Sequence, residues 1–182
     1  MGRRNTFKLD VVSIRMVRDS PIYSDKKIEN PEAAVELLGE VLRDMDREIV
    51  CVVNLKTSGV PINCTFASTG ALNYAVANPR ELLKSSILSN AANIILVHNH
   101  PSGTLVPSKA DVSMTQRLQY VCEMVDIPLL DHIIVGGDNR EYFSFREGAM
   151  LQKANLSFVS DYKDLDWGEK GNDITGKGKG CR

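Results

Sequence analysis

The sequence contains no long apolar run of the kind that crosses a membrane. No apolar segment approaches the ~20 residues that a membrane-spanning helix needs, so we expect no membrane association. The amino terminus carries positive charge without an apolar run behind it, which argues against a secretory signal. These absences predict a cytoplasmic protein.

The chain also lacks an excess of either charge and any close pair of cysteines. Lys and Arg number 22 against 23 Asp and Glu, for a net charge of −1. That balance gives no basic surface for nucleic acid, so composition does not support a DNA partner. None of the 4 cysteines forms a C-x-x-C pair, and Cys51 and Cys122 lie in apolar patterns typical of buried thiols.

What is present is enough apolar sequence for a single folded domain. The chain has 182 residues, of which 43% are hydrophobic, ordinary values for one domain with appendages. We expect an N-terminal extension over residues 1–29, with an edge strand at residues 8–17. The domain itself should cover residues 30–150. Residues 151–182 shift toward Asp, Gly and Lys, which predicts a flexible tail.

Hydrophobic patterning predicts an α/β (α+β) fold, in which two or three helices pack on a mixed β-sheet. Asn30-Pro31 and Asn78-Pro79 each read as a helix cap followed by a proline in the first turn. The predicted helices cover residues 31–45, 79–88 and 108–125. The predicted strands cover residues 48–55, 62–68, 93–97, 129–135 and 142–145, the first two as a hairpin.

The segment with the clearest chemistry begins at His98-Asn99-His100-Pro101. Side chains two apart on a strand point the same way, so His98 and His100 can face one metal ion. Pro101 cannot continue the hydrogen-bond ladder and should end the strand there. An H-x-H pair also arises by chance, so the pair alone leaves that alternative open.

A carboxylate follows at the start of the next predicted helix. Ser108-x-x-Asp111 is almost a capping box, in which Ser108 caps the helix and Asp111 sits in the first turn. A carboxylate held there can still face a metal ion. Two imidazoles and one carboxylate suit Zn2+ and leave a fourth position open, which is the catalytic arrangement.

These residues resemble a known family. His98-x-His100-Pro101 with Ser108-x-x-Asp111 resembles the JAMM motif of JAB/MPN metalloproteases. The fuller run from His98 to Gly103, with Asn78-Pro79-Arg80-Glu81 before it and the run from Asp131 to Gly136 after it, is similar to the RadC branch. The resemblance implies a cytidine-deaminase-like JAB/MPN core. It also implies three zinc ligands, His98, His100 and Asp111.

The resemblance further implies a glutamate from an earlier strand as general acid/base and the serine of S-x-x-D as an oxyanion stabiliser. Glu48 stands where that glutamate falls, although it could simply belong to the charged turn before the strand. Glu40 and Glu81 compete with it but look like helix-surface residues. Ser108 fits the serine, while a purely capping role is equally compatible with the sequence. For His132 we favour a core or supporting role over a fourth metal ligand.

Two functions remain open at this point. The first is a zinc peptidase or isopeptidase acting on a peptide or protein substrate through a metal-activated water. The second is a DNA repair-associated or mobile-element accessory protein with little peptidase activity. RadC proteins usually carry helix-hairpin-helix segments before this domain, and the thirty or so preceding residues show no such pattern. We therefore expect a stand-alone catalytic module and favour the first function.

Deaminase and nuclease sites fit less well. The cysteine ligands typical of zinc deaminases and the carboxylate-rich ligand sets typical of nucleases are missing from this motif.

Overall fold

The computed structural model describes residues 13–69, 78–136 and 141–151. Within these ranges the chain forms three helices and five strands. In chain order they are α1 (Pro31–Arg43), β1 (Ile49–Leu55), β2 (Pro61–Thr69), α2 (Pro79–Leu88), β3 (Asn93–His100), α3 (Lys109–Met124), β4 (Leu129–Gly136) and β5 (Tyr142–Ser144). None of the described helices is long and apolar enough to cross a membrane.

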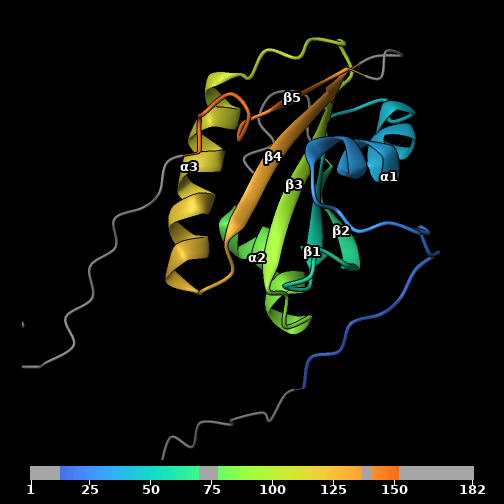
Figure 1. Cartoon of the computed structure of the whole chain (residues 1–182), viewed down its shortest axis with the longest axis vertical. Coiled ribbons are helices and arrows are strands. Elements are labelled where there is room, and N and C mark those ends of the chain that lie inside the picture. The colour runs from blue at the N-terminus through green and yellow to red at the C-terminus, as the bar shows by residue number, and fades with distance from the viewer. Residues whose placement is uncertain (1–12, 70–77, 137–140, 152–182) are drawn as a thin grey trace, which may run out of the picture.

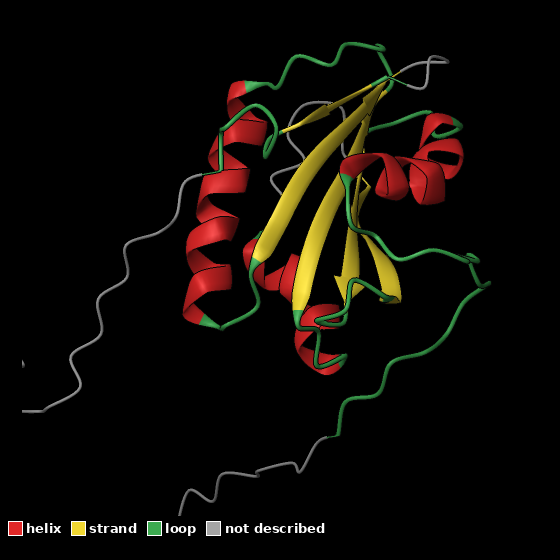
Figure 2. Cartoon of the chain, in the orientation of Figure 1, coloured by secondary structure: helices red, strands yellow, loops and turns green. Residues whose placement is uncertain are grey.

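The five strands form one mixed sheet in the order β2-β1-β3-β4-β5. β3 and β4 run parallel and are joined through α3, while the other neighbouring strands pair antiparallel. In Figure 1 the sheet occupies the centre, with α1 on one side and α3 on the other. Figure 2 shows the same strands as a single layer between helices. The predicted α+β fold with a mixed sheet is confirmed.

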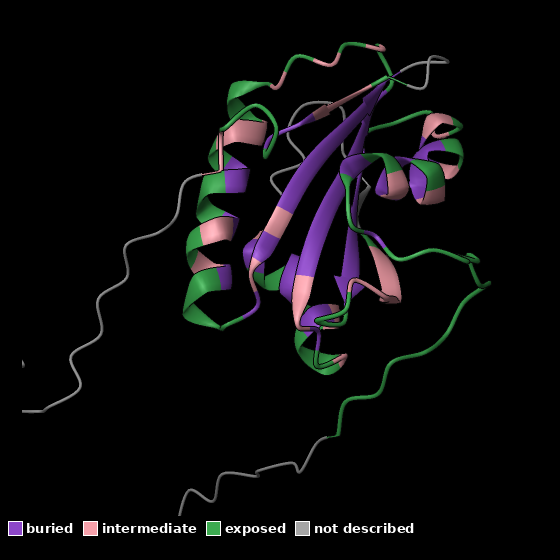
Figure 3. Cartoon of the chain, in the orientation of Figure 1, coloured by how far each residue is buried: buried purple, intermediate pink, exposed green. Residues whose placement is uncertain are grey.

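Both faces of the sheet are covered, which explains the unbroken apolar runs of the central strands. On β1, Cys51 and Val53 pack with α1, whereas Val50 and Val52 pack with α2 and α3. Figure 3 shows the central strands buried along nearly their whole length, with exposed residues on the outer helix faces. Packing on both faces holds the sheet in place, so it gives side chains near the strand ends fixed positions.

The helix starts follow the predicted capping signals. The side chain of Asn30 accepts a hydrogen bond from the Ala33 N–H at 2.9 Å, and Asn78 caps α2 in the same way through Arg80. Ser108 caps α3. α1 ends at Arg43, two residues before the predicted end, because Asp44 already caps its last turn.

The predicted strand at residues 8–17 is wrong in the part that the structure describes. Ser13–Val17 forms no strand, and Ile14 and Val17 are 74% and 88% exposed. Alternation predicts a strand only where a neighbour can bond its N–H and C=O groups, and this segment has no such neighbour among the described residues. The extension joins the domain later, where the Ile28 N–H donates to the Gly59 carbonyl at 2.9 Å. Nearly all of the predicted tail, residues 152–182, lies outside the described residues.

Candidate metal centre

His98 and His100 lie on the last residues of β3 and present their rings to the same side of the sheet. They are almost fully buried, at 2% and 5% exposure. Their ring centroids lie 4.6 Å apart in an edge-to-face arrangement. β3 ends at His100, directly before Pro101, as predicted. Both imidazoles are therefore held at the end of a central strand.

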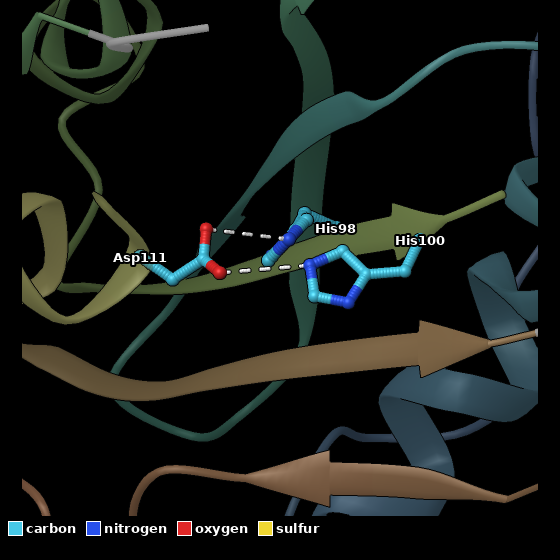
Figure 4. A group of neighbouring side chains, drawn as sticks. All are labelled: His98, His100 and Asp111. Atoms are coloured by element: carbon cyan, nitrogen blue, oxygen red, sulfur yellow. Dashed lines mark ion pairs between the residues drawn. The ribbon is translucent and has the colours of Figure 1, made fainter. Parts of the chain in front are cut away.

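Asp111 approaches the two histidines from the first turn of α3. The Ser108 N–H donates to Asp111 Oδ2 at 2.7 Å, and the Asp111 N–H donates to Ser108 Oγ at 3.2 Å, which completes a capping box. The two bonds fix the carboxylate with one oxygen toward each ring. Asp111 Oδ1 lies 3.6 Å from His98 Nε2, and Oδ2 lies 3.5 Å from His100 Nε2 (Figure 4).

The hydrogen bonds behind His98 determine which of its nitrogens carries the proton. Thr115 Oγ1 donates its only hydrogen to the Asp111 carbonyl at 2.6 Å. His132 Nδ1, 2.6 Å from the same hydroxyl, must then be the donor to it. His132 Nε2 is left as an acceptor, so the His98 Nδ1–H donates to it at 2.8 Å. His98 Nε2 consequently carries a lone pair, and it has no hydrogen-bond partner among the described residues.

The same reasoning applies to His100. Its Nδ1 lies 2.7 Å from the Thr104 carbonyl oxygen, which can only accept, so Nδ1 carries the proton. When the ring is neutral, the Nε2 lone pair of His100 faces Asp111. Ligand atoms of the three residues lie within 4.8 Å of one another. Three ligand atoms that converge in this way form a site that could hold a cation, and two imidazoles with one carboxylate suit zinc.

The pKa shifts favour the protonation states that ligands need at His98 and Asp111, and the opposite state at His100. Burial lowers the pKa of His98 to about 4 and lowers that of His132 as well, so both rings are neutral at pH 7. Burial alone would raise the pKa of Asp111, but hydrogen bonds from His100 and Ser108 outweigh it and lower the pKa. The hydrogen bond with Asp111 raises the pKa of His100, so a proton and a metal ion compete for its Nε2.

Residues 28–150 match the family model of the RadC-like JAB domain. The chain belongs to the RadC-like JAB family.

Two curated relatives are UPF0758 proteins of clostridia. The one from Clostridium acetobutylicum is 40% identical over 129 residues, and the one from Clostridium beijerinckii is 35% identical over 130 residues. Each match covers 71% of this chain and 56% of the relative, so the chain spans about half the length of these proteins. Their names state no activity.

In this RadC-like JAB domain, Glu48 directly precedes β1, whose pairing with β3 ends at Val50 opposite His98. Glu48 is thus two residues before the partner of a candidate ligand. Its charge contributes to the raised pKa of His100. The competing residues lie elsewhere: Glu81 bonds Lys84 on the surface of α2, and Glu40 is exposed on α1.

The structure also places the residues that sequence reasoning treated as secondary or missed. His132 is bonded at both nitrogens and cannot be a fourth ligand, in line with the supporting role that we favoured. Thr115, which connects His132 to α3, was not predicted. Its only sequence signal is its position four residues after Asp111, which is one turn along the same helix face.

Proposed function

We propose that this RadC-like JAB domain is a zinc-dependent hydrolase that cleaves a peptide or isopeptide bond. The observation that carries the proposal is the convergence of His98 Nε2, His100 Nε2 and the Asp111 carboxylate at one point. Hydrogen bonds place a proton on the Nδ1 atom of each ring, so the neutral rings present their Nε2 lone pairs to the carboxylate. A buried set of acceptors without donors is costly unless a cation joins it.

His98, His100 and Asp111 would hold the ion, and the proposal assigns the remaining steps to Glu48 and Ser108. A bound divalent ion acidifies water and polarises a carbonyl oxygen. Peptide hydrolysis also needs a group that takes a proton from water and returns one to the leaving amine. Glu48 suits that task, because it is exposed, it lies two residues before the partner of His98, and its charge acts on His100.

Ser108 could stabilise the negative charge that develops on the carbonyl oxygen. Its Oγ accepts the Asp111 N–H, and this leaves its own hydrogen free to donate. The residue is exposed at the start of α3, next to the carboxylate that would bind the ion. A donor held in place before the reaction begins is the arrangement that oxyanion stabilisation requires.

The test combines metal analysis with a peptide-library cleavage screen. The wild type should bind one zinc ion and cleave a subset of peptides, and His100→Ala should lose both properties. Glu48→Gln should keep the ion and lose cleavage, whereas the surface control Glu40→Gln should keep both. A zinc-loaded wild type that cleaves no peptide or isopeptide would contradict the proposal. Salt-dependent binding of duplex DNA by that inactive protein would favour the accessory role instead.

A further inference from the structure

The ladder between β1 and β3 stops two residues before β3 itself ends at His100. The residue after His100, Pro101, has no N–H to donate to the neighbouring strand. The last regular pair is Val50 with His98. The backbone just before it, at residues 47–49, carries the candidate base Glu48 and needs another partner for its N–H and C=O groups.

The side chain of Asn99 supplies that partner. Asn99 Oδ1 accepts the Ile49 N–H at 2.8 Å, and Asn99 Nδ2 donates to the Arg47 carbonyl at 3.0 Å. Asn99 is only 2% exposed. Its carboxamide thus bonds the residues on either side of Glu48, and the donor and acceptor requirements of the backbone fix which end of the carboxamide points where.

We propose that Asn99 is a positioning residue that holds Glu48 over the metal centre. The inference rests on the function proposed above and adds a residue to it. Glu48 is exposed, so packing does not hold its side chain, and its place depends on the backbone that carries it. The adjacent ion pair between Asp46 and Arg47 is on the surface and contributes little to that placement.

Asn99 lies between the two histidines in sequence. Residues 98–100 therefore position both the candidate ligands and the backbone that carries Glu48. The side chains of His98 and His100 face the candidate ion, and that of Asn99 reaches the strand bearing the base. An asparagine is suited to the task because its carboxamide carries both a donor and an acceptor. The substitution Asn99→Asp would leave only acceptors at this position, and Asn99→Leu would leave neither donor nor acceptor, so the two variants form a graded series.

The test uses the full chain loaded with Co2+ in place of zinc. Paramagnetic broadening of the Glu48 carboxyl carbon reports how near Glu48 lies to the ion, and hydrogen exchange of the Ile49 amide reports the bond to Asn99. We expect broadening to decrease from wild type to Asn99→Asp to Asn99→Leu. Ile49 exchange should rise about five- to tenfold in Asn99→Leu, the value for one lost hydrogen bond. Co2+ stoichiometry should stay at one ion per chain.

Asn54→Leu is the matched control, since Asn54 is a buried carboxamide near the other end of β1 that donates to Asn63 and Ser85. It should leave the Glu48 signal and Ile49 exchange at wild-type values. The proposal is overturned if Asn99→Leu matches wild type in both measurements, if Asn54→Leu causes the same changes, or if Asn99→Leu loses the ion. Should Asn99→Leu fold poorly, Asn99→Asp alone must still reduce the broadening.

Peptide cleavage separates this proposal from the function on which it rests. With a cleaved peptide in hand, Asn99→Leu should lower kcat about 100-fold with KM little changed, the scale expected for a displaced catalytic group. Wild-type kcat in that variant would overturn the role of Asn99 and leave the hydrolase intact. A wild type that cleaves nothing, but shows the graded Glu48 displacement, would refute the hydrolase and leave the role of Asn99 in placing Glu48 standing.

Discussion

His98 Nδ1 lies 2.8 Å from His132 Nε2, so one buried imidazole determines the orientation and protonation of another. The chain of bonds continues through the Thr115 hydroxyl to the backbone carbonyl of Asp111. It therefore runs from one candidate ligand to the helix turn that carries another. The ring of Phe145 stacks on His132 with centroids 4.6 Å apart and holds it from the other side. The candidate centre depends on these residues as well as on its three ligands.

Replacing Thr115 with valine should weaken metal binding without removing a ligand. His132 Nδ1–H would lose its acceptor, and the ring could then turn or change tautomer, leaving His98 free to protonate Nε2. Losses of supporting partners typically cost 10–100-fold in affinity, and we expect a value in that range from competition with a chromophoric chelator. Thr115→Ser retains the hydroxyl and is the control. Equal zinc affinities for the valine and serine variants would contradict the hydrogen-bond chain from His98 through His132 to Thr115.

Ser108→Gly should separate the capping role of Ser108 from its proposed catalytic role. Glycine is a tolerable N-cap, so unfolding free energy should fall by only a few tenths of a kcal/mol. Loss of the hydroxyl donor should lower kcat about 10²–10³-fold if Ser108 stabilises the oxyanion. Thermal denaturation and steady-state kinetics on the same preparation give both numbers. A variant with unchanged kcat would assign Ser108 to capping alone.

Gly136→Ala should disturb the loop that supports His100. A Cβ atom at Gly136 would lie 2.7 Å from the Gly103 carbonyl oxygen and 3.0 Å from Leu105 Cδ2. Residue 104 of this loop accepts the His100 Nδ1–H, so a displaced loop should also weaken metal binding. We expect a stability loss of about 1–3 kcal/mol, typical of overpacking, measured by urea denaturation.

The control for that substitution is Gly148→Ala. Its Cβ would meet the end of the Phe143 ring at 3.1 Å and the Ser144 carbonyl oxygen at 3.2 Å, and neither residue bonds a candidate ligand in the described part of the chain. It can reduce stability but should leave zinc affinity unchanged. If Gly136→Ala also binds zinc with wild-type affinity, the Thr104 contact is not needed to hold His100 in its binding orientation.

Asp131→Asn should change stability in a pH-dependent way. Burial raises the pKa of Asp131, although bonds from Ser144, Arg146 and His132 partly oppose the shift. A folded-state pKa above the unfolded value of about 3.9 means that ionising Asp131 disfavours folding. This cost is absent below the unfolded pKa, grows as pH rises through the raised pKa, and is then constant.

The uncharged asparagine avoids that cost, so the stability of Asp131→Asn relative to wild type should increase from about pH 3 toward neutral pH. Urea denaturation across that range measures the difference, with the exposed Asp126→Asn as control. A constant difference, or one that falls as pH rises, would contradict the raised pKa.

Local signals in the sequence were sufficient for most of the fold. Asn30, Asn78 and Ser108 mark helix starts because each supplies a side-chain oxygen where the first turn has free N–H groups. The H-x-H pair could be placed on one face because strand alternation is strict. The convergence of Asp111 with the pair was predicted from family resemblance, and the geometry now gives its physical reason in the capping box.

Other features depend on pairings that the sequence does not encode locally. Nothing in the sequence near Thr115 shows that it bonds His132, because that contact exists only once β4 lies beside β3. In the same way, Asn99 bonds residues 47 and 49 only once β1 lies beside β3. The error at residues 8–17 has the same origin, because an alternating pattern does not reveal whether a neighbouring strand exists.

The three candidate ligands come from consecutive elements, β3 and α3, whereas Glu48 directly precedes β1. By our proposal, the group that moves protons is therefore joined to the ligands only through the pairing of β1 with β3, which ends at Val50 and His98. Substitutions that weaken this pairing should separate metal retention from hydrolysis.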